Sequence, residues 1–306
     1  MSDQKPPAPL ESGPDKSWEH FEIFKAVKDS IYSLPSRFES NLHVSGVLAT
    51  DLFAFNSALS ASIEEQVVIS LNRLRSVWDP EENYALYDFE RRPQTFPDVV
   101  LKASSTEIQP QIVLGIELKG WYVLAKENEP SFRYKVTPAV CAPWDLLVIV
   151  PWALSEVVSG RPRIFSPFVT SAHYAAEYKN WYWQNKMSGS SDKSITLSSE
   201  DGFYPSKSLK ISDKPRKDSG NNFGRLARTG ILDNYRTELF QERLAGISLA
   251  SWQKFLAIFT ETSTPAIVEA ELGKLVKAMQ KERPDSEKRA KLMEKMKEFA
   301  ILIDED

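Results

Sequence analysis

The sequence predicts an α/β fold with a central mixed β-sheet, helices on its flanks and a helical C-terminal region. Two short apolar runs rich in β-branched residues, 96–101 and 112–122, are separated by a polar connector, which is the pattern of two neighbouring strands. A third run, from Asp145 to Val150, is apolar after its first residue, as expected of a central strand covered on both faces. Stretches with apolar residues at helical spacing lie before and after these strands.

Two helices and one further strand are predicted ahead of these runs. Residues 17–34 carry apolar side chains at helical spacing, with Ser17 as a cap and Pro35 just past the end. Residues 63–78 repeat this spacing and stop before Asp79. Residues 84–90 alternate apolar and polar side chains, which predicts the first strand of the sheet.

The chain after residue 150 is expected to add one strand, over 164–169, and then to become mainly helical. The helix over 171–184 is rich in aromatic side chains, which fit either the core or stacking on exposed bases. Four more helices are expected between 234 and 303. The last, over 285–303, is amphipathic and charged, and it fits either a cover for the core or pairing with a second copy in a homodimer.

Composition divides the chain into three parts. The polar, Pro-rich residues 1–16 predict a disordered N-terminus, residues 17–230 a core domain and residues 231–306 a helical C-terminal region. Within the core domain, 187–222 is a long segment rich in Ser, Lys, Gly and Asp. A connection of this length is usually functional or disordered.

Several functional classes are disfavoured by composition. No apolar run reaches the roughly 20 residues of a membrane span, so we expect no membrane partner. The single cysteine, Cys141, leaves no partner for a disulfide within the chain and suits a reducing cytoplasm, where we expect the protein. Three widely separated histidines argue against a structural zinc site. The sequence contains no phosphate-binding loop motif, so no nucleotide-driven motor is indicated.

Charged side chains interrupt the two runs that predict neighbouring strands. Asp98 follows Pro97 at the start of the first run, while Glu117 and Lys119 lie two positions apart in the second and so project from one face. In an antiparallel pair, the two acids would converge within reach of one divalent cation. Mg²⁺ takes such hard oxygen ligands, lowers the pKa of a bound water and neutralises charge on a phosphate. A neighbouring lysine can orient that water.

Pro97-Asp98 followed by Glu117-Leu118-Lys119 resembles the motif of the PD-(D/E)xK nuclease superfamily, to which many restriction endonucleases belong. The resemblance covers residues 60–185 and implies a restriction-endonuclease-like core. It also implies hydrolysis of double-stranded DNA with Mg²⁺, or Mn²⁺, as the cofactor, and Asp98, Glu117 and Lys119 as the catalytic residues. The metal ligands would be Asp98, Glu117 and the backbone carbonyl of Leu118.

In several branches of that superfamily, a helix ahead of the Pro-Asp strand adds a further acidic residue to the metal site. At ~100° per residue, Glu64 lies on the flank of the apolar stripe of the helix over 63–78, whereas Glu65 points nearly opposite to the stripe. Glu64 is therefore the better candidate. The simpler alternative is that both acids only favour the positive end of the helix dipole.

The net charge of −4 conceals a basic middle of the chain. From Arg161 to Arg236 there are 13 Lys and Arg against 7 Asp and Glu, a balance of +6, which leaves 25 against 35, or −10, for the rest. A phosphate-binding face needs such a basic region, although an ordinary solvated loop has the same composition. The candidate DNA-binding residues are Arg133, Lys135, Arg225 and Arg228.

The favoured interpretation is a metal-dependent endonuclease of the type II restriction class. One alternative is a nuclease of the same superfamily that acts in repair or on modified DNA. Another is a DNA-binding protein that has this fold without catalysis. A glycosidase that uses Asp98 and Glu117 as its acid pair fits less well, because it would give Lys119 no role.

Overall fold

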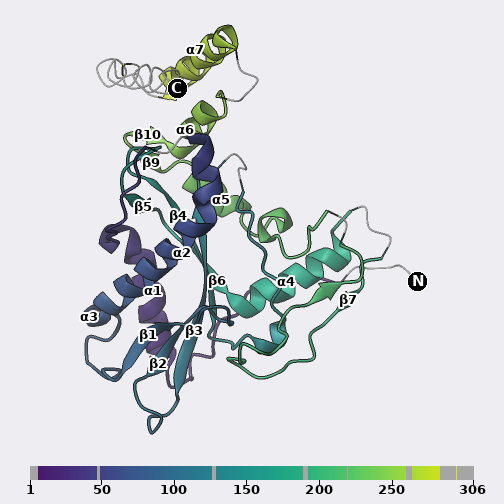
Figure 1. Cartoon of the computed structure of the whole chain (residues 1–306). Coiled ribbons are helices and arrows are strands. Elements are labelled where there is room, and N and C mark those ends of the chain that lie inside the picture. The colour runs from purple at the N-terminus through teal and green to yellow at the C-terminus, as the bar shows by residue number, and fades with distance from the viewer. Residues whose placement is uncertain are drawn as a thin grey trace.

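The structure, a computed structural model, describes residues 6–46, 49–125, 129–188, 192–218, 220–259, 264–282 and 294. These residues form an α/β fold around a mixed six-stranded sheet, in the order β1-β2-β3-β4-β5 with β6 paired to β4 (Figure 1). The strands are β1 (Tyr87–Arg91), β2 (Val99–Ala103), β3 (Ile112–Tyr122), β4 (Leu146–Leu154), β5 (Pro162–Ile164) and β6 (Phe168–Ser171). The α/β class with a central mixed sheet, predicted from the apolar runs, is confirmed.

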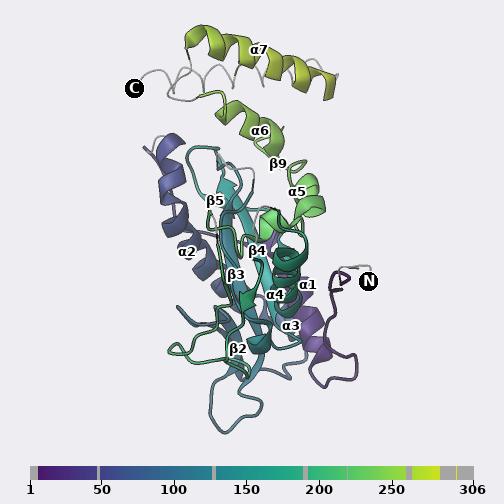
Figure 2. The same ribbon diagram turned by 90° about the vertical axis from the view of Figure 1, so that its right-hand side faces the viewer.

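Helices cover both faces of this sheet (Figures 1 and 2). One face packs against α1 (Phe21–Arg37), α2 (Ala49–Arg73) and α3 (Arg75–Trp78), and the other against α4 (Ala172–Asn185) and the 3-10 turn η1 (Pro138–Val140). The 3-10 turn η2 (Leu226–Thr229) precedes the C-terminal region, which contains α5 (Asp233–Leu239), α6 (Leu249–Leu256) and α7 (Pro265–Glu282). Two small sheets pair β7 (Ile195–Thr196) with β8 (Lys214–Pro215) and β9 (Arg243–Leu244) with β10 (Ile247–Ser248).

The register of β2 on β3 leaves half of β3 without a strand on one side. β2 and β3 pair antiparallel, as predicted, and the first residue of β2, Val99, lies opposite Ile116. β3 pairs with β4 in parallel on its other side, from Ile116 to Tyr122. Among the described residues, no strand therefore pairs with 117–122 of β3 on the side of β2. Asp98 immediately precedes β2, so it lies at the start of this free edge.

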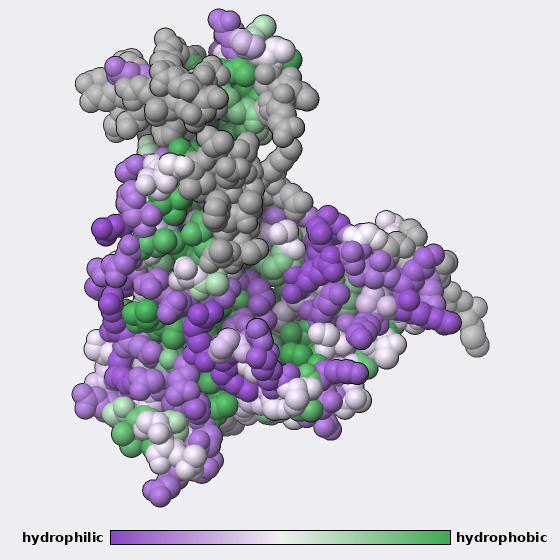
Figure 3. All heavy atoms as spheres, viewed as in Figure 1, coloured by the Kyte–Doolittle hydropathy of each residue, from purple (hydrophilic) through white to green (hydrophobic). Residues whose placement is uncertain are grey.

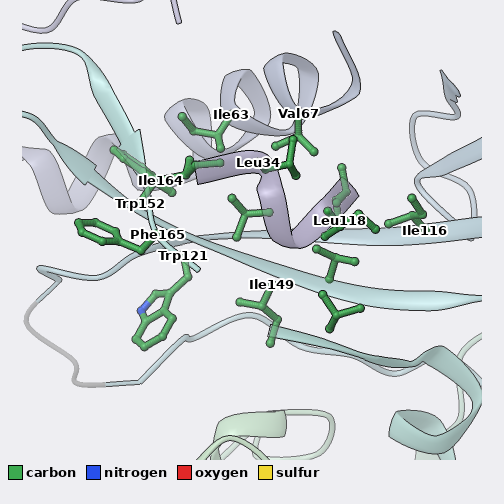
Figure 4. Close-up of a cluster of buried hydrophobic side chains, with 14 of the residues drawn as sticks. Leu34, Ile63, Val67, Ile116, Leu118, Trp121, Ile149, Trp152, Ile164 and Phe165 are labelled. Atoms are coloured by element: carbon green, nitrogen blue, oxygen red, sulfur yellow. The ribbon is translucent and has the colours of Figure 1, made fainter. Parts of the chain in front are cut away.

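Two apolar cores form because the central strands are covered on both faces. On the side of α1 and α2, Ile116 and Leu118 of β3 pack with Ile63 and Val67 of α2 and with Leu34 of α1 (Figure 4). On the side of α4, Leu147 of β4 packs with small alanines of the helix. All nine residues of β4 are buried, as the continuous apolar run predicts.

Some element boundaries differ from the sequence-based expectation. α1 begins at Phe21 rather than at Ser17, and it continues through Pro35 to Arg37. Ser17 lies in the preceding turn, where the Asp15 carboxylate accepts hydrogen bonds from its backbone N–H and hydroxyl at 2.8 and 2.7 Å. The predicted helix over 63–78 is the second half of α2 followed by α3, and the strand expected over 164–169 is divided into β5 and β6.

The outer segments are described in part. Residues 6–16 contain no helix or strand, and two of them hydrogen-bond to β6 and α4. The helix predicted over 285–303 lies outside the described residues, apart from residue 294. Figure 3 shows a mainly hydrophilic face, including the arm formed by α4 and β7. In the described part of the chain, no helix combines the length and apolar character needed to cross a bilayer.

Candidate active site

The predicted catalytic residues meet at the free edge of β3. The Lys119 ammonium lies 3.0 Å from Asp98 Oδ2 and 2.8 Å from Glu117 Oε1, so one cation pairs with two carboxylates. Glu117 and Lys119 project from one face because side chains alternate along a strand. Asp98 reaches the same place because it immediately precedes β2, and Val99 of β2 is aligned with Ile116 of β3.

Backbone N–H groups of the free edge are bound by acidic side chains. Leu118 N–H donates to Asp98 Oδ2 at 3.2 Å, and the Glu64 carboxylate lies near enough to Gly120 N–H for this group to lower the pKa of Glu64. In an extended strand the N–H and C=O of one residue point to the same side, so the Leu118 carbonyl also lies on this edge. The edge therefore gathers Asp98, Glu64 and the Leu118 carbonyl, three of the four metal ligands expected from the sequence.

Glu64 rather than Glu65 faces the site, in agreement with the helical-phase argument. Glu65 is exposed, whereas the Glu64 side chain is 21% exposed and lies 3.9 Å from Arg91 of β1. Gly120 makes this approach of α2 possible. A Cβ at Gly120 would lie 2.7 Å from Ser60 Cβ, closer than carbon atoms pack, so a glycine is needed where α2 crosses β3.

Burial and neighbouring charges shift the pKa values of Glu117, Glu64 and Lys119. Burial raises the pKa of Glu117 to about 7, because desolvation and the charge of Asp98 outweigh the attraction of Lys119. Burial and the Asp98 charge also raise the pKa of Glu64, against the opposing effects of Lys119, Gly120 N–H and Arg91. Burial lowers the pKa of Lys119, but Glu117 and Asp98 outweigh it and hold that pKa above its ordinary value. Lys119 is therefore a cation at neutral pH.

The donor set fits a hard divalent cation. Glu117 Oε2 is buried and has no hydrogen-bond partner among the described residues, which leaves its lone pairs available to a cation. No group of three His, Cys, Asp or Glu side chains within the described ranges is arranged to hold an ion. Mg²⁺ commonly takes only one or two carboxylates and completes its shell with water. Asp98 and Glu117, with the Leu118 carbonyl, satisfy that requirement.

A buried carboxylate that the sequence analysis did not single out holds the turn next to Asp98. Asp145 accepts hydrogen bonds from the backbone N–H groups of Gly115 and Ala142, both at 2.8 Å, and from the Tyr204 hydroxyl at 3.1 Å. Burial raises its pKa to about 7 against these hydrogen bonds. A Cβ at Gly115 would meet Pro97 at 2.3 Å and the Asp145 carboxylate at 2.7 Å, so Asp145, Gly115 and Pro97 are in close contact.

The long polar segment over 187–222 is connected to the turn that precedes Asp98. Arg92 donates hydrogen bonds to the carbonyl of Phe96 at 3.5 Å and to that of Pro205 at 3.0 Å, while its own N–H donates to the carbonyl of Asp98 at 2.7 Å. The turn that carries Asp98 is thus linked to residues 204–205 through Arg92 and Asp145. In the sequence, Asp145 is recognisable only as an acidic residue at the start of an apolar strand. Ordinary strand ends have the same pattern, so it does not predict the structural role of Asp145.

A second buried ion pair anchors the remainder of this segment. Lys179 of α4 lies 3.3 Å from Asp213, and both side chains are at most 1% exposed. Asp213 also accepts hydrogen bonds from Asn180 Nδ2 at 2.8 Å and from Ser198 N–H at 3.0 Å. The segment over 187–222 is therefore held against α4 at its described residues, although its composition resembles that of a solvated loop.

The candidate DNA-binding residues form two adjoining pairs. Tyr134 N–H donates to the carbonyl of Gly224 at 2.7 Å, which places 133–135 alongside 224–228. Tyr134 belongs to the same buried cluster as Phe96, which lies two residues before Asp98, so this strip passes beside the candidate site. Arg133 and Lys135 are half-buried. Arg228 is paired with Glu129 at 3.2 Å, whereas Arg225 has a buried Nε without a partner among the described residues.

Comparisons of the chain with protein-family models, with curated proteins and with solved structures give no match. The functional argument therefore rests on the geometry of the site.

Proposed function

We propose that the chain is a metal-dependent endonuclease that hydrolyses phosphodiester bonds of double-stranded DNA, of the type II restriction class, with a restriction-endonuclease-like core. The observation that carries the proposal is the position of Lys119 within 3.0 Å of two carboxylates, Asp98 and Glu117, at the free edge of β3. The order of these groups supports it as well. An acid on helix α2 precedes the Pro-Asp turn, and the Glu-x-Lys strand follows, as in the superfamily that the sequence resembles.

Asp98, Glu117 and the Leu118 carbonyl would hold Mg²⁺ or Mn²⁺. Bound there, the ion would supply a water of lowered pKa and would neutralise charge on the scissile phosphate. Lys119 contributes as a cation and hydrogen-bond donor, because its raised pKa keeps it protonated at neutral pH. It therefore orients a water or a phosphate oxygen rather than removing a proton. Glu64, on the other side of the edge, can accept a hydrogen bond from water held in the same place.

The electrostatics of the site also favour the entry of a cation. The carboxylates of Asp98 and Glu117 pair with one lysine at the edge, while Glu64 lies 3.9 Å from Arg91 and near enough for the Asp98 charge to raise its pKa. The raised pKa values of Glu64 and Glu117 report like charges held close together in a desolvated place. A divalent ion relieves this repulsion.

Incubation of the purified protein with plasmid and genomic DNA, in Mg²⁺ or in EDTA, tests the proposal. We expect cleavage only in Mg²⁺, with discrete fragments for sequence-specific cutting, whereas a smear would indicate a general nuclease. Asp98→Ala and Glu117→Ala should each abolish cleavage in folded protein. Glu64→Gln should slow the chemical step, and Glu65→Gln, as the matched control on the exposed side of α2, should not. Full activity of a folded Asp98 or Glu117 variant would refute the assignment.

A DNA-binding protein without catalysis is the second candidate. The observation that favours it is that Lys119 already pairs with both carboxylates, so charge at Asp98 is compensated without a metal ion. DNA that is bound but remains intact in both Mg²⁺ and Mn²⁺ would support this candidate.

A further inference from the structure

A cavity of about 510 Å³ lies beside β6, on the other side of β4 from the candidate active site. This α5 cavity is lined by residues 166–169, by Tyr32 of α1 and by residues of α5 and just after it. Phe168 is aligned with Ile149 of β4, and Ile149 is aligned with Lys119 of β3 on its other side. The cavity is therefore separated from the candidate active site by the width of the central strands, and it is a different site.

Three aromatic residues, Tyr32, Phe168 and Tyr235, line the α5 cavity. The ring centroids of Phe168 and Tyr235 are 5.3 Å apart. The Tyr235 hydroxyl donates a hydrogen bond to the carbonyl of Ser166 at 2.6 Å, which holds the Tyr235 ring beside the connection between β5 and β6. Tyr32 is 47% exposed and lies where the cavity meets solvent. Aromatic faces carry negative electrostatic potential, so such a lining favours a cation over an anion.

Two carboxylates line the same cavity, those of Glu238 and Glu242. Glu242 Oε1 accepts a hydrogen bond from Ser166 N–H at 3.3 Å, which fixes the Glu242 side chain against the connection. Neither glutamate forms an ion pair with a described residue. No Lys, Arg or His is among the described residues that line the cavity. Two negative charges therefore lack a positive partner in the protein.

The phenol groups agree with this distribution of charge. Burial, the charge of Glu242 and the neighbouring Tyr32 raise the pKa of Tyr235. Burial and the charges of Glu11 and Asp29 raise the pKa of Tyr32, so two more carboxylates lie near the rim of the cavity. Both tyrosines are neutral at physiological pH, and the potential around them is negative.

We propose that the α5 cavity is a binding site for an alkylguanidinium cation, carried either by a free small molecule or by an arginine side chain. A guanidinium is planar and weakly hydrated, so it can stack on an aromatic ring while its N–H groups pair with carboxylates. An ammonium ion is more strongly hydrated and fits this lining less well. The volume lies within the roughly 300–1,000 Å³ of small-molecule sites. The proposal is independent of nuclease activity, because it uses none of the residues of the candidate active site.

A titration of the full chain with n-butylguanidinium at low ionic strength tests the proposal. We expect saturable changes in the amide NMR shifts of residues 166–169, with a Kd of about 1 mM for a ligand of this size. The isosteric but neutral n-butylurea is the matched ligand and should cause no saturable change. N-acetyl-arginine-N-methylamide distinguishes the two sources: tighter binding than n-butylguanidinium favours an arginine side chain, and weaker binding favours a free small molecule.

Variants of the cavity show which groups hold the cation. Glu242→Gln keeps an acceptor for Ser166 N–H but removes the charge, and it should weaken n-butylguanidinium binding ~tenfold. Tyr32→Leu keeps an apolar side chain at an exposed helical position but removes the ring, and it should weaken binding ~threefold. Glu107→Gln makes the same charge change at an exposed position between β2 and β3, and it should have no effect.

Three results would overturn the proposal. They are the absence of saturable shifts at residues 166–169 at about 10 mM ligand, an equal response to n-butylurea, and an equal Kd in Glu242→Gln and Glu107→Gln. If Glu242→Gln does not fold, Tyr32→Leu takes its place in the last comparison, because Tyr32 is exposed and outside the core.

Discussion

A single methyl group at Gly120 tests how closely α2 must approach β3. A Cβ there would lie 2.7 Å from Ser60 Cβ, and ordinary contact begins at 3.4 Å, so Gly120→Ala must move the two elements apart by about 0.7 Å, the difference between those values. Overpacking of this kind costs about 1–3 kcal/mol. We therefore expect the free energy of unfolding to fall by that amount in a urea titration, with an unchanged dependence on denaturant.

The same displacement should affect cleavage. Glu64 lies one turn along α2 from Ser60 and its carboxylate lies near Gly120 N–H, so the movement of α2 carries this carboxylate away from the edge. Misplacement of a catalytic group by 1 Å can lower a rate about 10²-fold. We expect a loss of about this size in single-turnover cleavage of DNA in Mg²⁺, with little change in DNA affinity.

Two further variants decide whether the clash is the cause. Ser60→Gly in the Gly120→Ala chain removes the contacting Cβ and should restore most of the cleavage rate. Gly273→Ala on α7, where a Cβ would meet nothing within 4 Å, should leave cleavage unchanged and stabilise the helix by up to about 1 kcal/mol. Wild-type stability and cleavage in Gly120→Ala, or failure of Ser60→Gly to restore activity, would refute this reasoning.

Three other predictions follow from the same geometry. The pKa of Glu117 is raised to about 7 in the folded protein, so its contribution to the free energy of unfolding in EDTA should fall by about 3 kcal/mol as pH rises from 4.5 to 7. Glu117→Gln should remove this part of the pH dependence, as measured by denaturant titrations at each pH. Tyr204→Phe should cost about 1 kcal/mol and speed proteolysis within 187–222. Asp145→Asn should cost more, because it replaces the oxygen that accepts from buried Ala142 N–H by an NH2 donor; equal protease resistance in both variants would contradict the link. Arg225→Ala should flatten the salt dependence of DNA binding by about one unit of slope, and Arg228→Ala by less because Arg228 is paired with Glu129; a larger effect at Arg228 would reverse this ranking.

The features predicted correctly depend on the regular periods of secondary structure. Alternation along a strand places Glu117 and Lys119 on one face whatever the tertiary fold. The helical period likewise separates Glu64 from Glu65 once the apolar stripe is known. The antiparallel pairing of β2 with β3 follows from two short runs and a polar connector, and it brings Asp98 to the same edge.

The features that were missed depend on single contacts between distant parts of the chain. Tyr204 reaches Asp145 across 59 residues, and Lys179 reaches Asp213 across 34, and neither pair leaves a repeating pattern in the sequence. The contacts of the N-terminal segment with α4 and β6 are directional hydrogen bonds to Trp181, Ser171 and Thr170, which composition does not report.

The free edge of β3 has a consequence for self-association. An unpaired strand edge is a template for pairing with another chain and so for aggregation. Here Asp98 accepts a hydrogen bond from Leu118 N–H and the Glu64 carboxylate lies near Gly120 N–H, so negative charge covers the edge where a foreign strand would add. We therefore expect the two acids to disfavour the addition of a foreign strand at this edge. A chain with alanine at both positions should form intermolecular β-structure on storage, whereas one with asparagine and glutamine should remain monodisperse.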